Sequence, residues 1–63
     1  MTIASKIRDR RLALGLTQEQ LSFVTGLRPN HISMIETGRK APTVATLKRI
    51  AKALDCKLDD LVE

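Results

Sequence analysis

Glycine, proline and threonine residues divide this sequence into five short segments, each with the apolar spacing of an amphipathic helix. Gly15, Gly26 and Gly38 each follow such a segment, where glycine commonly ends a helix. The pattern therefore predicts an all-α fold. The expected helices are Ile3 to Leu14, Thr17 to Thr25, Pro29 to Thr37, a fourth that is capped by Thr43 and carries Val44, Leu47, Ile50, Ala51 and Leu54, and a short last one marked by Leu58, Leu61 and Val62.

The second and third segments have clear start signals. Thr17 and Gln20 have the spacing of a capping box, in which each side chain hydrogen-bonds the backbone N–H of the other residue. Pro29 suits the first position of a helix, which makes Arg28 its N-cap. Two short helices joined by residues 26–28 have helix-turn-helix spacing. Spacing alone, however, does not separate this motif from an ordinary helical hairpin.

Size and cysteine content narrow the class of protein. A chain of 63 residues is expected to form one domain, residues 1–63. Its single cysteine, Cys56, fits a reducing cytoplasm and is expected to act as a small buried apolar residue. Cys56 and His31 cannot supply the ligands of a zinc site, so no metal is expected. No apolar run reaches the length of a membrane span, and a cytoplasmic location is expected.

The positive charge is concentrated in one part of the chain. The net charge is +4, and residues 1–42 hold seven basic against three acidic residues, whereas residues 43–63 hold four of each. Such a distribution favours a polyanionic partner. No paired carboxylates, nucleophile with a base, metal cluster or phosphate loop is present, so neither an enzyme nor a cofactor is expected.

Several motifs together resemble the phage-repressor and Cro type of helix-turn-helix regulators. The motifs are Leu16-Thr17-Gln18-Glu19-Gln20-Leu21, Gly26-Leu27, His31-Ile32-Ser33-Met34-Ile35-Glu36-Thr37-Gly38-Arg39 and Leu47-Lys48-Arg49-Ile50-Ala51-Lys52-Ala53-Leu54. The resemblance covers essentially the whole chain. It implies a five-helix bundle that binds double-stranded DNA, with the segment 29–37 as the recognition helix. Transcriptional regulation, most often repression, is the function that it implies.

Two charged residues fall on apolar stripes. Arg11 lies between Ile7 and Leu14, and Glu36 adjoins Ile32. Because inward charges need partners, we infer a structural ion pair between Arg11 and Glu36, and the resemblance implies the same pair.

The first turns of a recognition helix enter the major groove, so its outward positions are the candidates for base contacts. Asn30 is the strongest candidate, because its amide can donate and accept at the edge of adenine. Arg28 can pair with guanine or bind a phosphate, and Met34 can contact a thymine methyl group. The expected base-contacting residues are Arg28, Asn30, His31, Ser33 and Met34.

Other residues are expected to hold the DNA backbone. Gln18 opens the second helix where the resembled family places a phosphate-binding residue, and helix N-termini favour anions. Thr17 adds a hydroxyl group beside it. The full set of expected phosphate contacts is Thr17, Gln18, Thr37, Arg39, Lys40 and Arg10.

Two apolar groups have more than one interpretation. Leu58, Leu61 and Val62 either form part of a homodimer interface or close the core. Phe23 and Val24 either extend the core over the third helix or form a contact surface for another protein. The second interpretation is the one that an antitoxin or adaptor with this fold requires.

The sequence departs from the resembled family at three positions. Ser22 stands where alanine is usual, Asp55 where glycine is usual, and Lys57 where a better helix cap is common. We expect these departures to affect stability more than recognition.

Overall fold

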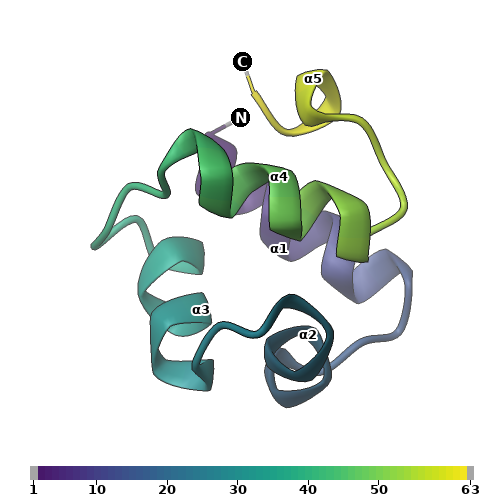
Figure 1. The fold of residues 1–63 in the computed structure, drawn as a ribbon, viewed down its shortest axis with the longest axis vertical. Coiled ribbons are helices and arrows are strands. Elements are labelled where there is room, and N and C mark those ends of the chain that lie inside the picture. Colours follow the sequence, from purple (N-terminus) through teal and green to yellow (C-terminus); the bar gives the residue numbers. More distant parts are fainter. Residues whose placement is uncertain (1, 63) are drawn as a thin grey trace.

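The computed structural model describes residues 2–62, which form five α-helices joined by short turns (Figure 1). This is the all-α architecture expected from the sequence. The starts of α2, α3 and α4 coincide with the signals of Thr17, Pro29 and Thr43, and α1, α2 and α3 end within two residues of a glycine. The helices are α1 (Ile3–Ala13), α2 (Gln18–Thr25), α3 (Pro29–Glu36), α4 (Val44–Ala53) and α5 (Leu58–Leu61).

Threonine hydroxyl groups cap three of the five helices. Thr17 Oγ1 accepts from Gln20 N–H while Gln20 Oε1 accepts from Thr17 N–H, which completes the expected capping box. Thr43 Oγ1 accepts from Thr46 N–H at the start of α4. Thr2 and Ser5 form a further capping box at the start of α1, which sequence analysis missed. Each cap satisfies N–H groups that a helix cannot pair internally.

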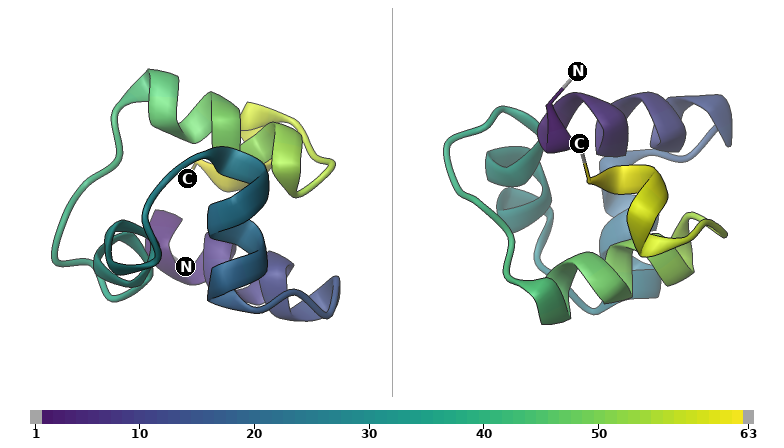
Figure 2. Two further views of the ribbon diagram at one scale, coloured as in Figure 1. Left: turned by 60° about the horizontal axis from the view of Figure 1, so that its bottom comes forward. Right: turned by 90° about the horizontal axis from the view of Figure 1, so that it is seen from above.

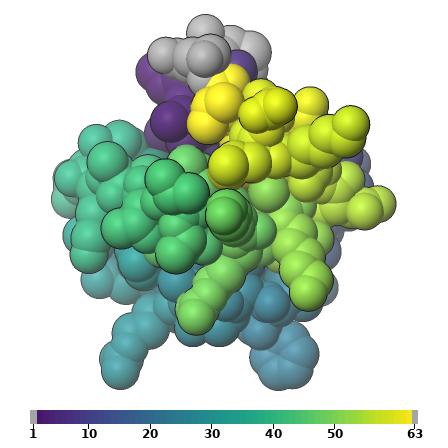
Figure 3. Space-filling view, turned by 45° about the horizontal axis from the view of Figure 1, so that its top comes forward, coloured from purple at the N-terminus to yellow at the C-terminus, as the bar shows by residue number. Residues whose placement is uncertain are grey.

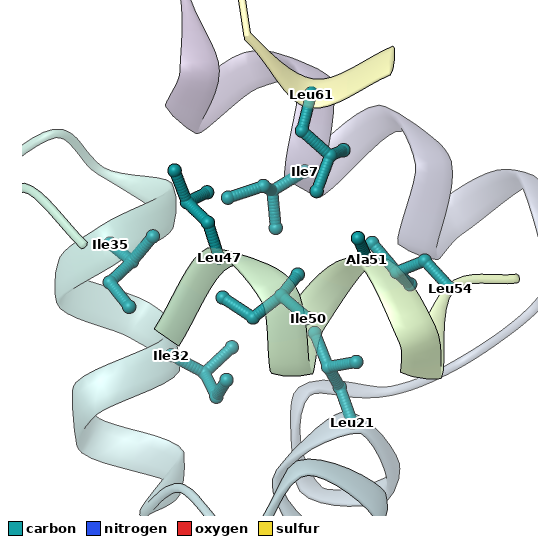
Figure 4. Close-up of a cluster of buried hydrophobic side chains, with 9 residues drawn as sticks. All are labelled: Ile7, Leu21, Ile32, Ile35, Leu47, Ile50, Ala51, Leu54 and Leu61. Carbon is teal, nitrogen blue, oxygen red and sulfur yellow. The ribbon is translucent and has the colours of Figure 1, made fainter. Parts of the chain in front are cut away.

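All five helices contribute to one apolar cluster in the described chain (Figure 4). Ile50 of α4 lies between Ile32 of α3 and Leu21 of α2 in that view. Burying each leucine or isoleucine of this size contributes about 1.5–3 kcal/mol, which is how so short a chain can order its helices. The buried members are Ile7, Leu21, Ile32, Ile35, Leu47, Ile50, Ala51, Leu54 and Leu61.

The short helix α5 closes the core instead of offering all of its leucines to a partner. Leu61 is only 1% exposed, so its assignment to a dimer interface is wrong. Leu58 and Val62 are half-buried and pack against the same core. Lys6 Nζ donates to the carbonyl oxygen of Val62 at 2.8 Å, which ties the end of α5 to α1. Figure 3 shows the yellow α5 segment lying against the green α4.

Two residues that the periodicity placed on inward stripes are exposed. Leu14 is 45% exposed because α1 ends at Ala13 and Leu14 is its C-cap residue. Val44 is 60% exposed because it begins α4, one turn before the helix reaches the core at Leu47. Cys56 is half-buried and packs against the core.

The end of α4 contains the one described residue other than glycine with a left-handed backbone. Asp55 has φ 53°, a conformation that costs an L-residue roughly 1–2 kcal/mol, although aspartate tolerates it better than most. Its carboxylate also lies at a helix C-terminus, where the helix dipole disfavours negative charge. The departure from glycine at this position therefore carries a backbone penalty and an electrostatic penalty.

Replacing Asp55 with glycine is expected to stabilise the protein. Asp55→Gly removes both penalties, and the greater freedom of glycine in the unfolded chain offsets part of the gain, which leaves about 0.5–1 kcal/mol. Urea unfolding followed by circular dichroism measures the change. Asp55→Ala is the matched control: it removes the charge but keeps a Cβ, so it should not stabilise. An alanine variant as stable as the glycine variant would contradict the backbone argument.

Candidate nucleic-acid interface

A tight turn joins α2 to α3. Gly26, with φ 76°, is the left-handed C-cap of α2, and Arg28 is the extended N-cap of α3. Thr25 Oγ1 donates to the carbonyl oxygen of Leu21 and accepts from the N–H of Leu27 at 3.2 Å. Ser22 Oγ donates to the carbonyl oxygen of Leu27. Two hydroxyl groups of α2 thus hold the backbone that leads into α3.

The other end of α3 is held by the ion pair inferred from the sequence. Arg11 Nε donates to Glu36 Oε2 at 2.7 Å, and Arg11 Nη2 donates to Glu36 Oε1 at 2.9 Å, a bidentate arrangement. The side chains are only 9% and 2% exposed, respectively. Arg11 Nη1 also donates to the carbonyl oxygen of Leu16, so the pair connects α1, the turn after it and α3.

Gln18 joins this network from the first residue of α2. Its Nε2 donates to Glu36 Oε1 at 3.1 Å, which fixes the side chain at the point where α2 begins. The hydrogen bond from Arg11 to Glu36 raises the pKa of the Arg11 guanidinium above its usual value. Since a raised pKa preserves the charged form up to a higher pH, Arg11 stays charged throughout the neutral range.

The network and the turn present α3 at the edge of the molecule, beside α2 (Figures 1 and 2). Its inward face carries Ile32, Ile35 and Glu36, which are buried. All five expected base-contacting residues are at least partly accessible: helical spacing places Asn30 and Met34 opposite the buried face and His31 and Ser33 beside it, and Arg28 is the N-cap. Arg28 and Asn30 are exposed, whereas His31, Ser33 and Met34 are half-buried.

The expected phosphate contacts lie at both ends of the α2–α3 pair. Thr17 and Gln18 are at the start of α2, where α2 has free N–H groups. Thr37, Arg39 and Lys40 are exposed and follow α3. The carbonyl oxygen of Met34 accepts from the N–H groups of Arg39 and Lys40, so the backbone of the two basic residues is fixed to α3.

Arg10 does not belong with this group. Its Nε donates to the carbonyl oxygen of Leu54 at 3.2 Å, and its Nη2 donates to that of Asp55 at 3.1 Å. Arg10 therefore satisfies free carbonyl groups at the end of α4, as basic side chains commonly do at helix C-termini. The guanidinium group is thus used within the protein, and the structure does not support Arg10 as a phosphate contact.

Phe23 and Val24 do not extend the core. They are 88% and 58% exposed, so the interpretation that they cover α3 is wrong. Phe23 is the one phenylalanine of the chain, which has no tyrosine or tryptophan. Phe23 and Val24 line a shallow hollow on the outer face of α2, together with Leu16 and Glu19.

Sequence analysis also missed the roles of Ser22 and Thr25. Their hydroxyl groups act only through a turn whose shape the sequence does not specify in advance.

Within residues 2–62, no three histidine, cysteine or acidic side chains are grouped so that they can hold a metal ion.

A short helix held across a second one by a three-residue turn, with an accessible outer face and basic residues beside it, defines a helix-turn-helix DNA-binding domain. The model of the helix-turn-helix family matches residues 7–61. This chain belongs to that family.

Individual proteins similar to this chain include regulators and repressors. An uncharacterised HTH-type transcriptional regulator, y4dJ of Sinorhizobium fredii, is 37% identical over 60 residues, which cover 95% of this chain and 78% of that protein. The cryptic phage CTXphi transcriptional repressor RstR of Vibrio cholerae is 31% identical over 61 residues, 97% of this chain and 54% of that protein. The crystal structure of the P22 c2 repressor with a synthetic operator has a TM-score of 0.93 and 30% identity, and covers 100% of this chain and 96% of that chain.

Removing one member of the buried ion pair is expected to be severely destabilising. Glu36→Ala leaves the Arg11 charge buried without its partner, at a cost of about 3–5 kcal/mol. This is comparable with the whole stability expected of so small a domain, so the variant should be largely unfolded at 25 °C by circular dichroism.

A double variant distinguishes the charge effect from a packing effect. Arg11→Met with Glu36→Met removes both charges while it keeps apolar volume, and it should recover a large part of the thermal stability lost in Glu36→Ala. A Glu36→Ala protein that melts at the wild-type temperature would show that the pair does not hold α1 to α3.

Proposed function

We propose that this protein is a sequence-specific DNA-binding transcriptional regulator that acts as a repressor. The observation that carries the proposal is the recognition helix α3, which is anchored at both ends and leaves the first turns of its outer face accessible. Membership of the helix-turn-helix family and similarity to phage repressors support it. These same similarities favour regulation over an antitoxin or adaptor as the main role.

We place the N-terminal half of α3 in the major groove. Asn30 is exposed on the first turn of α3. There its amide NH₂ group can donate to N7 of adenine, and its amide oxygen can accept from the N6 amino group of the same base. Arg28 reaches from the N-cap position towards guanine or a phosphate. Met34, one turn further along, offers an apolar contact to a thymine methyl group. His31 and Ser33 complete the proposed base-reading set.

The DNA backbone is held on both sides of this helix. Gln18 and Thr17 meet one phosphate segment at the start of α2, where free N–H groups attract anions. Thr37, Arg39 and Lys40 meet another beyond α3. Hydrogen bonds to phosphate groups fix the position of a protein along the duplex, and they carry no sequence information directly.

Replacing Asn30 is expected to relax one position of the binding site. In a selection of bound sites from random DNA at fixed salt, the wild type should enrich a site with an adenine that Asn30→Ala no longer prefers, a loss of about 1–3 kcal/mol of discrimination. Lys40→Ala is the control, since loss of a phosphate contact weakens binding to all sequences alike. An unchanged site in Asn30→Ala would place Asn30 outside the groove. No enriched site for the wild type would contradict sequence-specific binding.

We further propose that two copies bind as a homodimer to an operator with two-fold symmetry. A single α3 reads only a few base pairs, and helix-turn-helix dimers place two such helices in successive major grooves, about 34–36 Å apart. Leu58 and Val62 keep accessible surface for such an interface, unlike Leu61. Exposed charges of both signs, including Lys52, Lys57 and Asp59, surround Leu58 and suit a self-complementary contact.

A change at Leu58 is expected to shift the protein towards monomer. Leu58→Asp places a charge in the proposed interface, yet it suits the first position of α5 because acids are favourable at helix N-termini. Sedimentation velocity over a range of concentrations should show dimer for the wild type and monomer for the variant, with circular dichroism showing that the variant is folded. Phe23→Lys, on α2, is the control and should remain dimeric. Loss of the dimer in Phe23→Lys but not in Leu58→Asp would move the interface to α2.

The exposed pair Phe23 and Val24 is proposed as a contact for a second protein. Aromatic side chains are enriched in protein interfaces, and α2 exposes this pair beside a hollow that Leu16 and Glu19 also line.

None of the described helices is long and apolar enough to cross a membrane.

A further inference from the structure

Hydroxyl groups of α2 hold both peptide units that flank the Cα atom of Leu27. Thr25 Oγ1 accepts from the N–H of Leu27, which fixes the unit between Gly26 and Leu27. Ser22 Oγ donates to the carbonyl oxygen of Leu27, which fixes the unit between Leu27 and Arg28. Because each peptide unit is planar, holding two successive units restrains both backbone dihedral angles of Leu27.

Leu27 is the central residue of the three-residue turn between the two helices of the motif. Gly26 is the C-cap of α2 and Arg28 is the N-cap of α3, so the dihedral angles of Leu27 contribute, with those of its two neighbours, to the direction in which α3 leaves α2. The start of α3 provides no hydrogen bond of its own for this purpose. The Arg28 side chain makes no cap hydrogen bond, and Pro29 has no N–H.

We propose that Ser22 is a positioning residue for DNA recognition, whose hydroxyl group fixes the direction of α3 and so sharpens discrimination between operator bases. This inference rests on the proposed function. The contact needs the hydroxyl group of this residue, because alanine in its place has no donor for the carbonyl oxygen of Leu27.

The effect falls on the end of α3 that reads bases. Glu36 anchors the C-terminal end of the helix through Arg11, whereas Ser22 acts at the N-terminal end, beside Arg28 and Asn30. Hydrogen bonds weaken steeply as their angles open, so a small rotation about the Glu36 anchor costs a bidentate base contact more than it costs a phosphate contact. Loss of the Ser22 bond therefore lowers sequence discrimination more than overall attraction to DNA.

The test measures Kd for three variants with two DNA duplexes. One duplex carries the operator that the wild type selects, and the other carries the same operator with its Asn30-dependent adenine replaced. Ser22→Ala is expected to raise Kd for the selected operator about three- to ten-fold, the range that corresponds to one neutral hydrogen bond, with a much smaller change for the altered site. Ser22→Thr keeps the hydroxyl group and should restore discrimination. Ser5→Ala removes the serine of the α1 capping box, so it should lower the melting temperature without changing the ratio of the two Kd values.

Residual dipolar couplings of the free protein give a readout that needs no DNA. Ser22→Ala should change the averaged orientation of α3 relative to α2, whereas Ser22→Thr and Ser5→Ala should not. Wild-type discrimination in Ser22→Ala, or unchanged couplings, would overturn the inference. A wild type that selects no site contradicts the proposed function instead, and the couplings then still decide whether Ser22 holds α3.

Discussion

The buried ion pair between Arg11 and Glu36 is the interaction on which the arrangement of the helices depends. Charges this well buried are tolerated only when every polar atom has a partner, and in the described chain each buried side-chain nitrogen and oxygen has one. The guanidinium group of Arg11 donates two hydrogen bonds to Glu36 and one to the carbonyl oxygen of Leu16. Gln18 donates a further hydrogen bond to the Glu36 carboxylate. The apolar core brings the helices together without direction, whereas this network specifies where α3 lies relative to α1 and α2.

The same network serves the proposed interface, because Gln18 belongs to both. Its amide is fixed by Glu36 at the start of α2, so the proposed phosphate-binding group and α3 share one anchor. The two hydroxyl groups of Ser22 and Thr25 restrain the opposite end of α3. A helix of eight residues gains little rigidity from its own hydrogen bonds, and its external anchors give the outer face a defined direction.

Much of the fold and part of the site could be predicted from the sequence. The helix boundaries followed from glycines, Pro29 and the Thr17 capping box, because these signals act within a few residues. The partnership of Arg11 with Glu36 followed from two charges on apolar stripes. The inward assignments of Leu14 and Val44 were wrong because periodicity does not show where a helix leaves the core. Arg10 was misassigned because its carbonyl partners, directly after α4, lie 44 and 45 residues away.

The sequence by itself determined which segments form helices, which faces are apolar and which residues on the third helix are polar, since these properties follow from local backbone preferences and side-chain chemistry. Only the tertiary structure decided that Leu61 closes the core, that Phe23 stays in solvent, that Arg10 caps α4 and that Ser22 holds the turn before α3. Each of these outcomes depends on a contact or an exposure set by how helices pack, and packing direction is not encoded in the periodicity of any one segment.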